Sequence, residues 1–485
     1  MKSLNATFRA PSHYKPTGSY KVLPFRFIRL EGNRYVVVNQ VGEHYILDRT
    51  VLADLVSHRL PQSSHIYNEL KSRHIVMDGD SEIAIELLAA KQRTRLSRLP
   101  DFTALHYFVV TLRCEHSCAY CQVSRVSQDK QAFDMSRETA DRAIDCMLQS
   151  PSASLKVEFQ GGEPLLNFSL IKYVVERTRA RAPDRAIEYV VATNLALIDD
   201  VMLDFFAANG IYISTSLDGP ASLHNQNRPR PGGDSYDRVI RGIAKARSRL
   251  GPSSVSALMT STPESLEQPE AIVDEYVRNG FKEIFVRWIS PYGFAARAQG
   301  RPYGTRDYLD FYKRALAHII KINLHGYPLR EVYASVILDR ILSPFPTGYV
   351  DLQSPSGIGI AAMAYNYDGD VYASDEGRML AEMGDKTFRM GNLHSDSYKA
   401  LFANSQVLPM IAASMAEGIP GCADCAFQPY CGSDPVFNHR AQGDVVGHRP
   451  TSDFCNRNMS IMKHLLLLLE DSPDAARVLK SWRSA

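Results

Sequence analysis

The stretch Tyr107-Phe-Val-Val-Thr-Leu-Arg-Cys114-Glu-His-Ser-Cys118-Ala-Tyr-Cys121-Gln122 predicts a short apolar strand that runs directly into three cysteines. The Cys-x3-Cys-x2-Cys spacing gathers three thiolates on one loop and offers no fourth sulfur nearby. A structural zinc ion takes four protein ligands, so three cysteines alone make a poor zinc site. An iron–sulfur cluster held by three cysteines keeps one iron open for another ligand. The loop therefore favours a [4Fe–4S] cluster.

This strand and loop resemble those of the radical S-adenosylmethionine (radical SAM) superfamily. In that superfamily the amino and carboxylate groups of the methionyl part of SAM chelate the open iron. An aromatic residue stands just before the last cysteine, as Tyr120 does here. The resemblance implies that the three cysteines bind the cluster and that Tyr120 contacts SAM.

Strand and helix patterns alternate from about residue 104 to residue 300 with the spacing of βαβ units, which indicates a parallel sheet. We expect strands at 106–112, 155–160, 188–193, 212–217, 255–260 and 283–289. We expect helices at 136–148, 170–180, 199–208, 236–249 and 264–279. The fold class is α/β, and the six units resemble the partial (β/α)6 TIM barrel of the radical SAM fold. In such barrels the chemistry lies at the C-terminal ends of the strands.

Glycines and polar residues follow these strands. The segment Phe159-Gln-Gly-Gly-Glu-Pro-Leu165 resembles the Gly-Gly-Glu-Pro motif that receives the methionyl ammonium of SAM, and glycines let a backbone approach a ligand closely. The segment Ser214-Thr-Ser-Leu-Asp-Gly-Pro220, followed by His224-Asn225 and an arginine, resembles anaerobic sulfatase-maturing enzymes. There a serine and an arginine hold the SAM carboxylate. The SAM contacts implied by these resemblances are Gly161, Gly162, Glu163, Thr193, Asn194, Ser216, Asp218 and Arg228. For Asp218 a simple Asp-Gly turn is the alternative.

Four more cysteines lie near the C-terminus: Cys422, Cys425, Cys431 and Cys455. Four thiolates suit either a structural zinc or a fully ligated cluster. Their spacing, with the upstream Asp368-Gly-Asp-Val-Tyr372, resembles the SPASM domain, which usually binds two auxiliary [4Fe–4S] clusters. Ser374 and Pro435 stand where that pattern has further cysteines. We therefore expect two clusters in total, one that binds SAM and one auxiliary cluster.

The segment Ser374-Asp-Glu-Gly-Arg378 contains the candidate catalytic base. In sulfatase-maturing relatives an aspartate directly follows the cysteine that Ser374 replaces, and it acts as a base. By that match Asp375 would accept the proton that an oxidation releases. Glu376 is the second candidate, and a solvated acidic turn is the alternative interpretation. The vacated cluster positions would then help to form a substrate pocket.

The N-terminal region predicts a separate module. Strands at 25–30, 34–39 and 44–47 precede helices at 49–57 and 63–73. This order resembles the winged-helix recognition module of peptide-modifying enzymes, which takes a leader peptide as an added strand. The alternative is a small accessory domain that only packs on the catalytic one. The expected domains are 1–95 (leader recognition), 96–304 (radical SAM barrel), 305–350 (helical bridge) and 351–485 (SPASM-like domain with a C-terminal helix).

Composition narrows the class of protein further. A formal net charge of +2 gives no reason to expect nucleic acid or a membrane as a partner. Residues 1–16 carry no signal-peptide pattern, and the longest apolar run, 465–469, is far shorter than the roughly 20 residues of a membrane span. The cysteines cluster as metal ligands do rather than forming a disulfide framework, so we expect a cytoplasmic location.

The whole chain resembles radical SAM/SPASM peptide maturases, in particular the His-Xaa-Ser system radical SAM maturase family. The resemblance implies that a 5′-deoxyadenosyl radical abstracts hydrogen from a side-chain carbon of a ribosomally made precursor peptide. An aromatic-to-β-carbon crosslink is one such product. Further partners would be a flavodoxin- or ferredoxin-type electron donor and a second maturase. The alternatives are a formylglycine-type maturase acting on a Ser or Cys of a protein, and a non-enzymatic iron–sulfur electron carrier.

Overall fold

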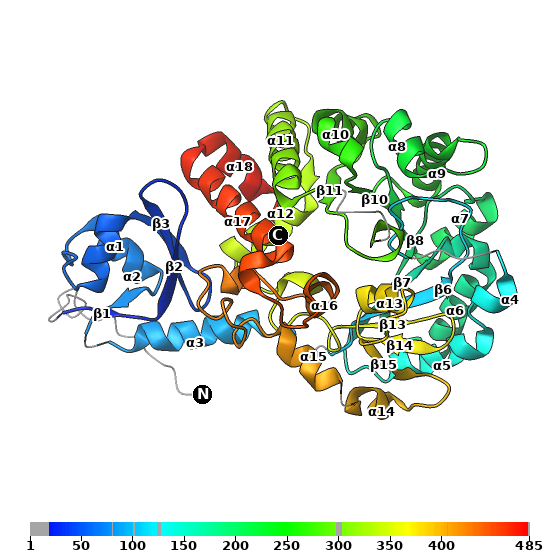
Figure 1. The fold of residues 1–485 in the computed structure, drawn as a ribbon, viewed down its shortest axis with the longest axis horizontal. Coiled ribbons are helices and arrows are strands. Elements are labelled where there is room, and N and C mark those ends of the chain that lie inside the picture. The colour runs from blue at the N-terminus through cyan, green and yellow to red at the C-terminus, as the bar shows by residue number, and fades with distance from the viewer. Residues whose placement is uncertain are drawn as a thin grey trace, which may run out of the picture. The chain divides into compact units, whose positions relative to one another are not determined.

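The computed structural model describes residues 19–79, 81–99, 102–123, 128–296, 303–404 and 406–483. The chain divides into two compact units (Figure 1). The first unit contains Met1–Ser97, Arg340–Pro346 and Asp424–Tyr430, and the second contains the rest. The expectation about a signal peptide in residues 1–16 lies outside the described residues.

The first unit is built on a three-stranded antiparallel sheet. Its strands lie in the order β2 (Phe25–Arg29), β3 (Arg34–Asn39) and β4 (His44–Asp48). Helices α1 (Arg49–Val56) and α2 (His65–Ser72) follow, which agrees with the predicted order of three strands and two helices. A small sheet of β1 (Lys21–Val22) and β5 (Val76–Met77) was not predicted, because two-residue strands show no alternation. Helix α3 (Ile83–Arg95) ends this part of the chain.

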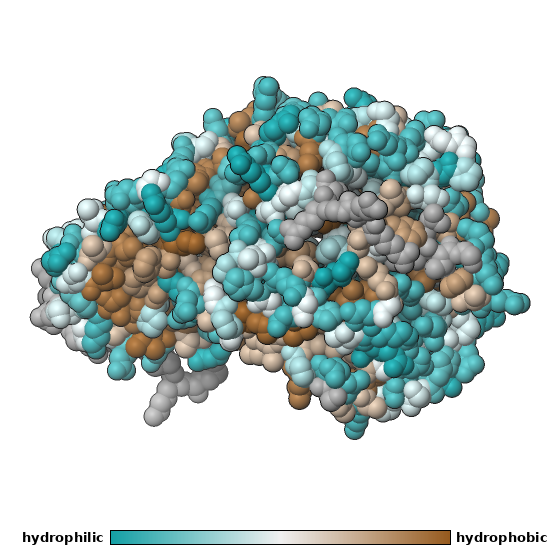
Figure 2. All heavy atoms as spheres, viewed as in Figure 1, coloured by the Kyte–Doolittle hydropathy of each residue, from teal (hydrophilic) through white to brown (hydrophobic). Residues whose placement is uncertain are grey.

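The surface of the first unit carries several exposed apolar side chains. In Figure 2 hydrophobic residues gather over this unit. Phe27 of β2 is 53% exposed, and Ile83, Ile85 and Leu87 of α3 are also exposed. Strand β2 is an edge strand of its sheet, so its outer backbone groups face away from β3. An exposed aromatic on an edge strand is a place where an extended peptide can add.

The second unit is organised on a ten-stranded sheet. Six successive strands pair in parallel and in chain order, as the sequence predicted. They are β6 (Leu105–Thr111), β7 (Ser154–Gly161), β8 (Ala186–Ala192), β9 (Tyr212–Ser216), β10 (Val255–Thr260) and β11 (Glu283–Arg287). Burial alternates along most of these strands, so one face of the sheet is fully buried, and Phe108, Val110 and Phe159 are completely inaccessible.

Helices connect the parallel strands and lie along the outside of the curved sheet (Figure 1). They are α5 (Arg137–Leu148), α6 (Phe168–Arg181), α7 (Asp200–Asn209), α9 (Ser235–Leu250) and α10 (Pro269–Arg278), with the short helices α4 (Lys130–Phe133) and α8 (Ala221–Asn227). The predicted helix at 264–279 is divided into a 3-10 turn, Pro263–Glu267, and α10. The division falls at Pro269, because proline is accepted at the first turn of a helix and breaks its interior.

The same sheet continues past both edges of the barrel strands. Strand β12 (Arg330–Glu331) pairs with β11, and β13 (Ala362–Tyr365) pairs in parallel with β6. Strands β14 (Asp370–Tyr372) and β15 (Arg389–Asn392) add as an antiparallel meander. The segment that resembles SPASM thus joins the sheet next to the strand that leads into the cysteine loop.

The remaining helices complete the second half of the chain. They are α11 (Thr305–Leu324), α12 (Val332–Leu342), α13 (Asp375–Ala381), α14 (Tyr398–Ala403), α15 (Val407–Ser414), α16 (Pro435–Gln442), α17 (Asp453–Asp471) and α18 (Pro473–Ser481). The apolar run 465–469 lies in α17 with Leu465 and Leu466 buried, as expected. Within the described ranges, the helices lack the combination of length and apolar character that a membrane span requires.

Candidate cofactor site

The loop after β6 carries Cys114, Cys118 and Cys121, and all three are half-buried. Backbone hydrogen bonds hold the loop in place. Ser117 N–H donates to the Pro229 carbonyl at 2.7 Å, and Phe294 N–H donates to the Cys121 carbonyl at 2.8 Å. Burial raises the pKa of Cys118 to about 11. A metal that binds this thiol must therefore displace its proton.

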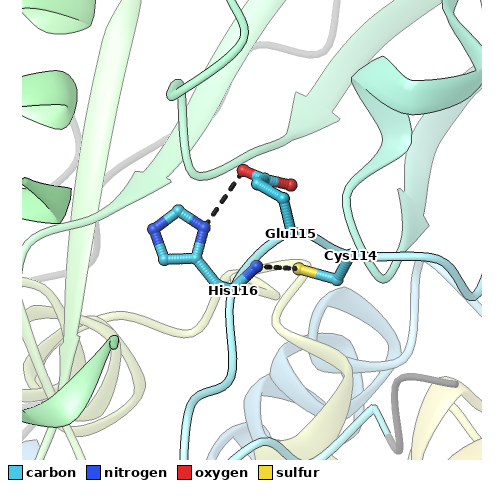
Figure 3. Close-up of side chains that lie close together, drawn as sticks. All are labelled: Cys114, Glu115 and His116. Carbon is cyan, nitrogen blue, oxygen red and sulfur yellow. Dashed lines mark hydrogen bonds and ion pairs between the residues drawn. The ribbon is translucent and has the colours of Figure 1, made fainter. Parts of the chain in front are cut away.

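A compact polar group supports the loop. The ligand atoms of Cys114, Glu115 and His116 lie within 4.8 Å of one another, and the His116 N–H donates to Cys114 Sγ at 3.4 Å (Figure 3). The His116 ring bonds Glu115 Oε1 at 3.0 Å and the Ser235 hydroxyl at 2.9 Å. Glu115 Oε1 also accepts from Asn194 Nδ2 at 2.9 Å. Because both side chains bond to neighbouring elements, we interpret this group as a support for the cysteine loop and not as a separate metal site.

The second carboxylate oxygen of this group suits a bound cation. Within the described residues, the buried Oε2 of Glu115 has no hydrogen-bond partner. A buried polar atom without a partner costs about 1–3 kcal/mol, and more if it is charged. A ligand with an ammonium group beside Cys114 would remove that cost. Three thiols on one loop and an unpaired carboxylate oxygen beside them together fit an iron–sulfur cluster with SAM as its ligand.

The glycines at the end of β7 lie against the backbone that leads into the cysteine loop. A Cβ on Gly161 would lie 1.9 Å from the Thr111 carbonyl oxygen, and one on Gly162 would lie 2.2 Å from the Arg113 carbonyl oxygen. The N–H groups of Gly162 and Glu163 donate to these same carbonyls at 2.8 and 2.7 Å. From the sequence, we explained these two glycines by a close approach of the backbone to a ligand. The structure gives it a second reason, which is the pairing of two strand ends.

Glu163 is fully buried at the centre of a hydrogen-bond network. Its carboxylate accepts from the Thr193 hydroxyl at 2.7 Å, the Asn194 N–H at 2.8 Å and the Leu165 N–H at 3.0 Å. Burial, followed by the negative charge of Glu115, raises the pKa of Glu163 to about 8. The predicted residues Glu163, Thr193 and Asn194 therefore meet at the ends of β7 and β8.

Three other predicted residues form a second buried network after β9. The Tyr120 hydroxyl donates to Asp218 Oδ2 at 2.5 Å, and Arg228 Nε donates to the same oxygen at 3.1 Å. The Arg228 guanidinium lies 5.4 Å from the centre of the Tyr120 ring. Burial acts to lower the pKa of Arg228, but the Asp218 carboxylate outweighs it and raises the pKa. Asp218 thus does more than form a turn, and Ser216 lies half-buried at the end of β9.

A histidine without a predicted role joins the two networks. His224 Nε2 lies 3.2 Å from the Ser235 hydroxyl, which also bonds His116, and His224 Nδ1 accepts from the Asp218 N–H at 3.3 Å. Burial lowers the pKa of His224 to about 4, so its ring is neutral near pH 7. His116 and Ser235 are 119 residues apart, and their spacing therefore carries no local sequence signal.

The candidate base Asp375 begins α13 and is only 5% exposed, which excludes the alternative of a solvated acidic turn. Its Oδ1 accepts from Arg378 Nη2 at 2.7 Å and from Nε at 3.2 Å, and Arg378 is fully buried. Glu376 instead lines a cavity. Burial, followed by the charge of Asp351, raises the pKa of Glu376 to about 7. Glu376 is therefore better suited than the paired Asp375 to take up a proton near neutral pH.

The four C-terminal cysteines are half-buried. Cys425 belongs to the first unit, and the other three belong to the second. Phe427 N–H donates to Cys425 Sγ at 3.4 Å, and Cys455 lies in the first turn of α17. Their role as ligands of an auxiliary cluster stays a prediction. The eighth cysteine, Cys146, is buried in α5, away from both groups of cysteines in the sequence.

Residues 108–286 match the family model of the radical SAM superfamily, so the barrel is a radical SAM domain. An uncharacterized protein of Methanocaldococcus jannaschii is 30% identical over 183 residues, which are 38% of this chain and 61% of that protein. The radical SAM cyclopropyl synthase TigE of Paramaledivibacter caminithermalis is 24% identical over 240 residues, 46% of each chain. A cysteine-type anaerobic sulfatase-maturating enzyme of Clostridium perfringens is 23% identical over 300 residues, 60% of this chain and 78% of that enzyme. The chain thus spans less than two thirds of the length of the first two relatives, 61% and 46%.

Solved structures share the fold over a larger part of the chain. The structure of native anSMEcpe with bound AdoMet has a TM-score of 0.64 at 19% identity, covering 78% of this chain and 99% of that one. Streptococcus suis SuiB bound to its precursor peptide SuiA has a TM-score of 0.53 at 16% identity, covering 90% of this chain and 99% of that one. These similarities confirm the α/β radical SAM fold.

Proposed function

We propose that this chain is a radical SAM maturase that oxidises a ribosomally made precursor peptide at a side-chain carbon. The observation that carries the proposal is the convergence of the Cys114 loop, Glu163 and Asn194 at the ends of β6, β7 and β8, inside a radical SAM domain. Proteins with this domain are enzymes: TigE is a radical SAM cyclopropyl synthase, and SuiB, which shares the fold, binds the precursor peptide SuiA. A protein that only carries electrons would need the cysteines, but it would have no use for the polar network of Glu163 and Asn194 beside the cysteine loop.

Each part of the site has a role in this proposal. Cys114, Cys118 and Cys121 would hold a [4Fe–4S] cluster, and the networks of Glu163 and Asp218 would hold SAM. When bound, these cofactors supply a 5′-deoxyadenosyl radical that can take hydrogen from an unactivated carbon. The protein binds and orients the peptide and keeps water away. From their spacing in the sequence, the four C-terminal cysteines would hold an auxiliary cluster.

An oxidation must also release an electron and a proton. The proton needs a base close to the peptide, and Glu376 is the better candidate because Asp375 is already paired with Arg378. A flavodoxin- or ferredoxin-type donor would supply the electron that SAM cleavage consumes. The electron released by the oxidation would leave the peptide through the auxiliary cluster and return to that carrier. Oxidation at a β-carbon next to an aromatic ring would give a carbon–carbon crosslink as one product.

The first unit would recognise the leader of the peptide. Strand β2 is an edge strand, and its Phe27 is 53% exposed. An added peptide strand gains backbone hydrogen bonds along such an edge, while exposed apolar side chains supply contacts for alternate residues of the peptide. A second maturase is a further proposed partner.

A formylglycine-type maturase is the second candidate function. The resemblance to a sulfatase-maturating enzyme over 60% of the chain and the aspartate at position 375 favour it. The two candidates differ in substrate. A formylglycine-type enzyme would convert a short Cys- or Ser-containing sulfatase peptide without a leader, whereas the proposed maturase would act only on a precursor that contains its leader.

The first test is anaerobic incubation of the reconstituted, dithionite-reduced protein with SAM, followed by mass spectrometry for 5′-deoxyadenosine. We expect 5′-deoxyadenosine to form, and we expect a leader-containing precursor from a neighbouring reading frame to increase its rate. If none forms with or without such a precursor, although iron is bound, the proposed function is wrong.

A further inference from the structure

A cavity with two lobes lies inside the second unit, beyond the C-terminal end of β11. One lobe has a volume of about 80 Å³ and the other about 50 Å³. One water needs only about 10–15 Å³ on this scale, so the space is that of a side chain. The lobes share three acidic residues, which are Asp351, Glu376 and Asp434.

The smaller lobe occupies the place where the sequence pattern lacks cysteines. Ser374 and Pro435 line it, and these are the two positions at which the SPASM pattern has cysteine ligands. Tyr107 of β6 also lines this lobe, so it reaches the strand that leads into the cysteine loop. The vacated region is therefore an accessible cavity with acidic walls, which agrees with the expectation that it forms a pocket.

The walls carry more negative than positive side chains. Asp351 is exposed and Glu376 and Asp434 are half-buried, so their carboxylates can be reached from the cavity. The cationic residues of the lining are Arg287 and Arg457. Close enclosure by protein, with the neighbouring acid as the next cause, raises the pKa of Asp351 and of Asp434 to about 6. One more positive charge would balance the three carboxylates.

Two buried polar groups line the larger lobe and are available for hydrogen bonds to a ligand. Tyr292 is 1% exposed and Arg457 is 9% exposed. In the described part of the chain, the Tyr292 hydroxyl and Arg457 Nη1 have no hydrogen-bond partner. A ligand N–H can donate to the tyrosine, and a ligand carbonyl can accept from the arginine. Unpaired buried groups of this kind can be satisfied by water or by a bound molecule, and they are independent of the acidic cluster.

The aromatic residues of the larger lobe also favour a cation. Trp288, Tyr308, Tyr333 and Tyr349 line it together with Tyr292. The Arg457 guanidinium already lies 5.3 Å from the centre of the Trp288 ring. Aromatic faces attract ammonium and guanidinium groups. A ligand that combines a cationic head, an apolar stem and a nearby carbonyl matches these walls, and a basic residue within a peptide has all three.

We propose that this cavity binds a lysine or arginine side chain of the substrate peptide, held between Asp351 and Asp434 and against the aromatic wall. The Tyr292 hydroxyl accepts a hydrogen bond from the cationic head, and Arg457 donates to the peptide carbonyl. Glu376 faces the same space and stays available as the proton acceptor. The proposal rests on the proposed function for the identity of the ligand as a peptide, but binding is measured without turnover.

The test compares two tripeptide probes, acetyl-Gly-Lys-Gly-amide and acetyl-Gly-Gln-Gly-amide. Each is titrated by calorimetry at pH 8 into the anaerobically reconstituted full chain, without SAM. We expect the lysine probe to bind at least 10-fold more tightly. The double variant Asp351→Asn/Asp434→Asn should lose this preference while its affinity for the glutamine probe stays the same. Asp434 caps α16 by accepting from Phe437 N–H at 2.9 Å, and asparagine caps a helix equally well, so the variant keeps that contact.

The matched control is Asp204→Asn/Asp274→Asn, which removes two carboxylates that are 57% and 54% exposed. It should keep the preference for lysine. Equal affinity of the wild type for both probes would overturn the proposal, as would a lysine preference that survives in the double variant. Because SAM cleavage is measured separately, a protein that forms 5′-deoxyadenosine but shows no lysine preference contradicts this inference alone. A protein with the reverse behaviour contradicts the proposed function alone.

Discussion

Replacing Glu163 by Gln tests the geometry at the end of β7. Glu163 Oε1 accepts from the Leu165 N–H and the Thr193 hydroxyl, and Oε2 accepts from the Asn194 N–H. Glutamine offers one acceptor oxygen and one NH2 group. In either orientation of the amide, the backbone N–H of Leu165 or of Asn194 therefore faces a donor.

The cost follows from the unmet hydrogen bond. A buried donor without an acceptor costs about 1–3 kcal/mol. Since 1 kcal/mol shifts the Tm of a 150–250-residue domain by about 2–4 °C, we expect Glu163→Gln to melt about 2–12 °C below the wild type. The matched control is Glu188→Gln, because Glu188 is an exposed carboxylate paired with Lys156 at 2.9 Å. Scanning calorimetry that finds Glu163→Gln melting together with Glu188→Gln would refute the argument.

The stability of the wild type should depend on pH through Glu163. Burial raises the pKa of Glu163 from 4.5 to about 8 in the folded protein. Between these values the folded state binds more protons than the unfolded state, so stability falls as the pH rises. Glutamine does not titrate. The difference in Tm between the wild type and Glu163→Gln should therefore shrink from pH 5 to pH 8, and a growing difference would contradict the assigned environment.

Gly162→Ala should prevent correct folding of the second unit, because its Cβ would lie 2.2 Å from a backbone carbonyl oxygen. Gly418→Ala, whose Cβ would meet nothing closer than 3.8 Å, should yield soluble protein as the control; equal yields would contradict the strand pairing. Glu376→Gln should slow peptide oxidation without slowing 5′-deoxyadenosine formation, and should remove a rise in the wild-type product rate from pH 6 to pH 8, because the pKa of Glu376 is about 7. An unchanged product rate would exclude it as the base. Phe27→Glu should weaken binding of a leader peptide by at least 10-fold in a fluorescence anisotropy titration, whereas Val201→Glu, at a more exposed apolar site on α7, should not; equal affinities would exclude the β2 face.

The barrel could be predicted from the sequence because its signals are local. The six strands are short apolar runs, and each is followed by a helix of regular period. The polar residues after them were found because parallel strands bring their C-terminal ends together. Glu163, Thr193 and Asn194 meet for that reason, although they stand on two different strands.

Other parts of the site have no such local signal. The link from His116 through Ser235 to His224 joins residues on three separate segments. The pairing of Asp375 with Arg378 competes with a catalytic role that the motif alone suggests. The acidic cavity combines residues from β11, η5 (Val350–Leu352), α13 and α17. Only the positions of Ser374 and Pro435 pointed to it, through the cysteines that they replace.

The most direct test of the central claim is to change Cys114, Cys118 and Cys121 together to Ala and to measure iron and 5′-deoxyadenosine in the same anaerobic preparation. With two [4Fe–4S] clusters the wild type should contain about eight irons per chain and the variant about four. The variant should also form no 5′-deoxyadenosine from SAM. Continued formation of 5′-deoxyadenosine by the variant, or an iron content that does not change, would contradict the assignment of this loop as the SAM-binding cluster site.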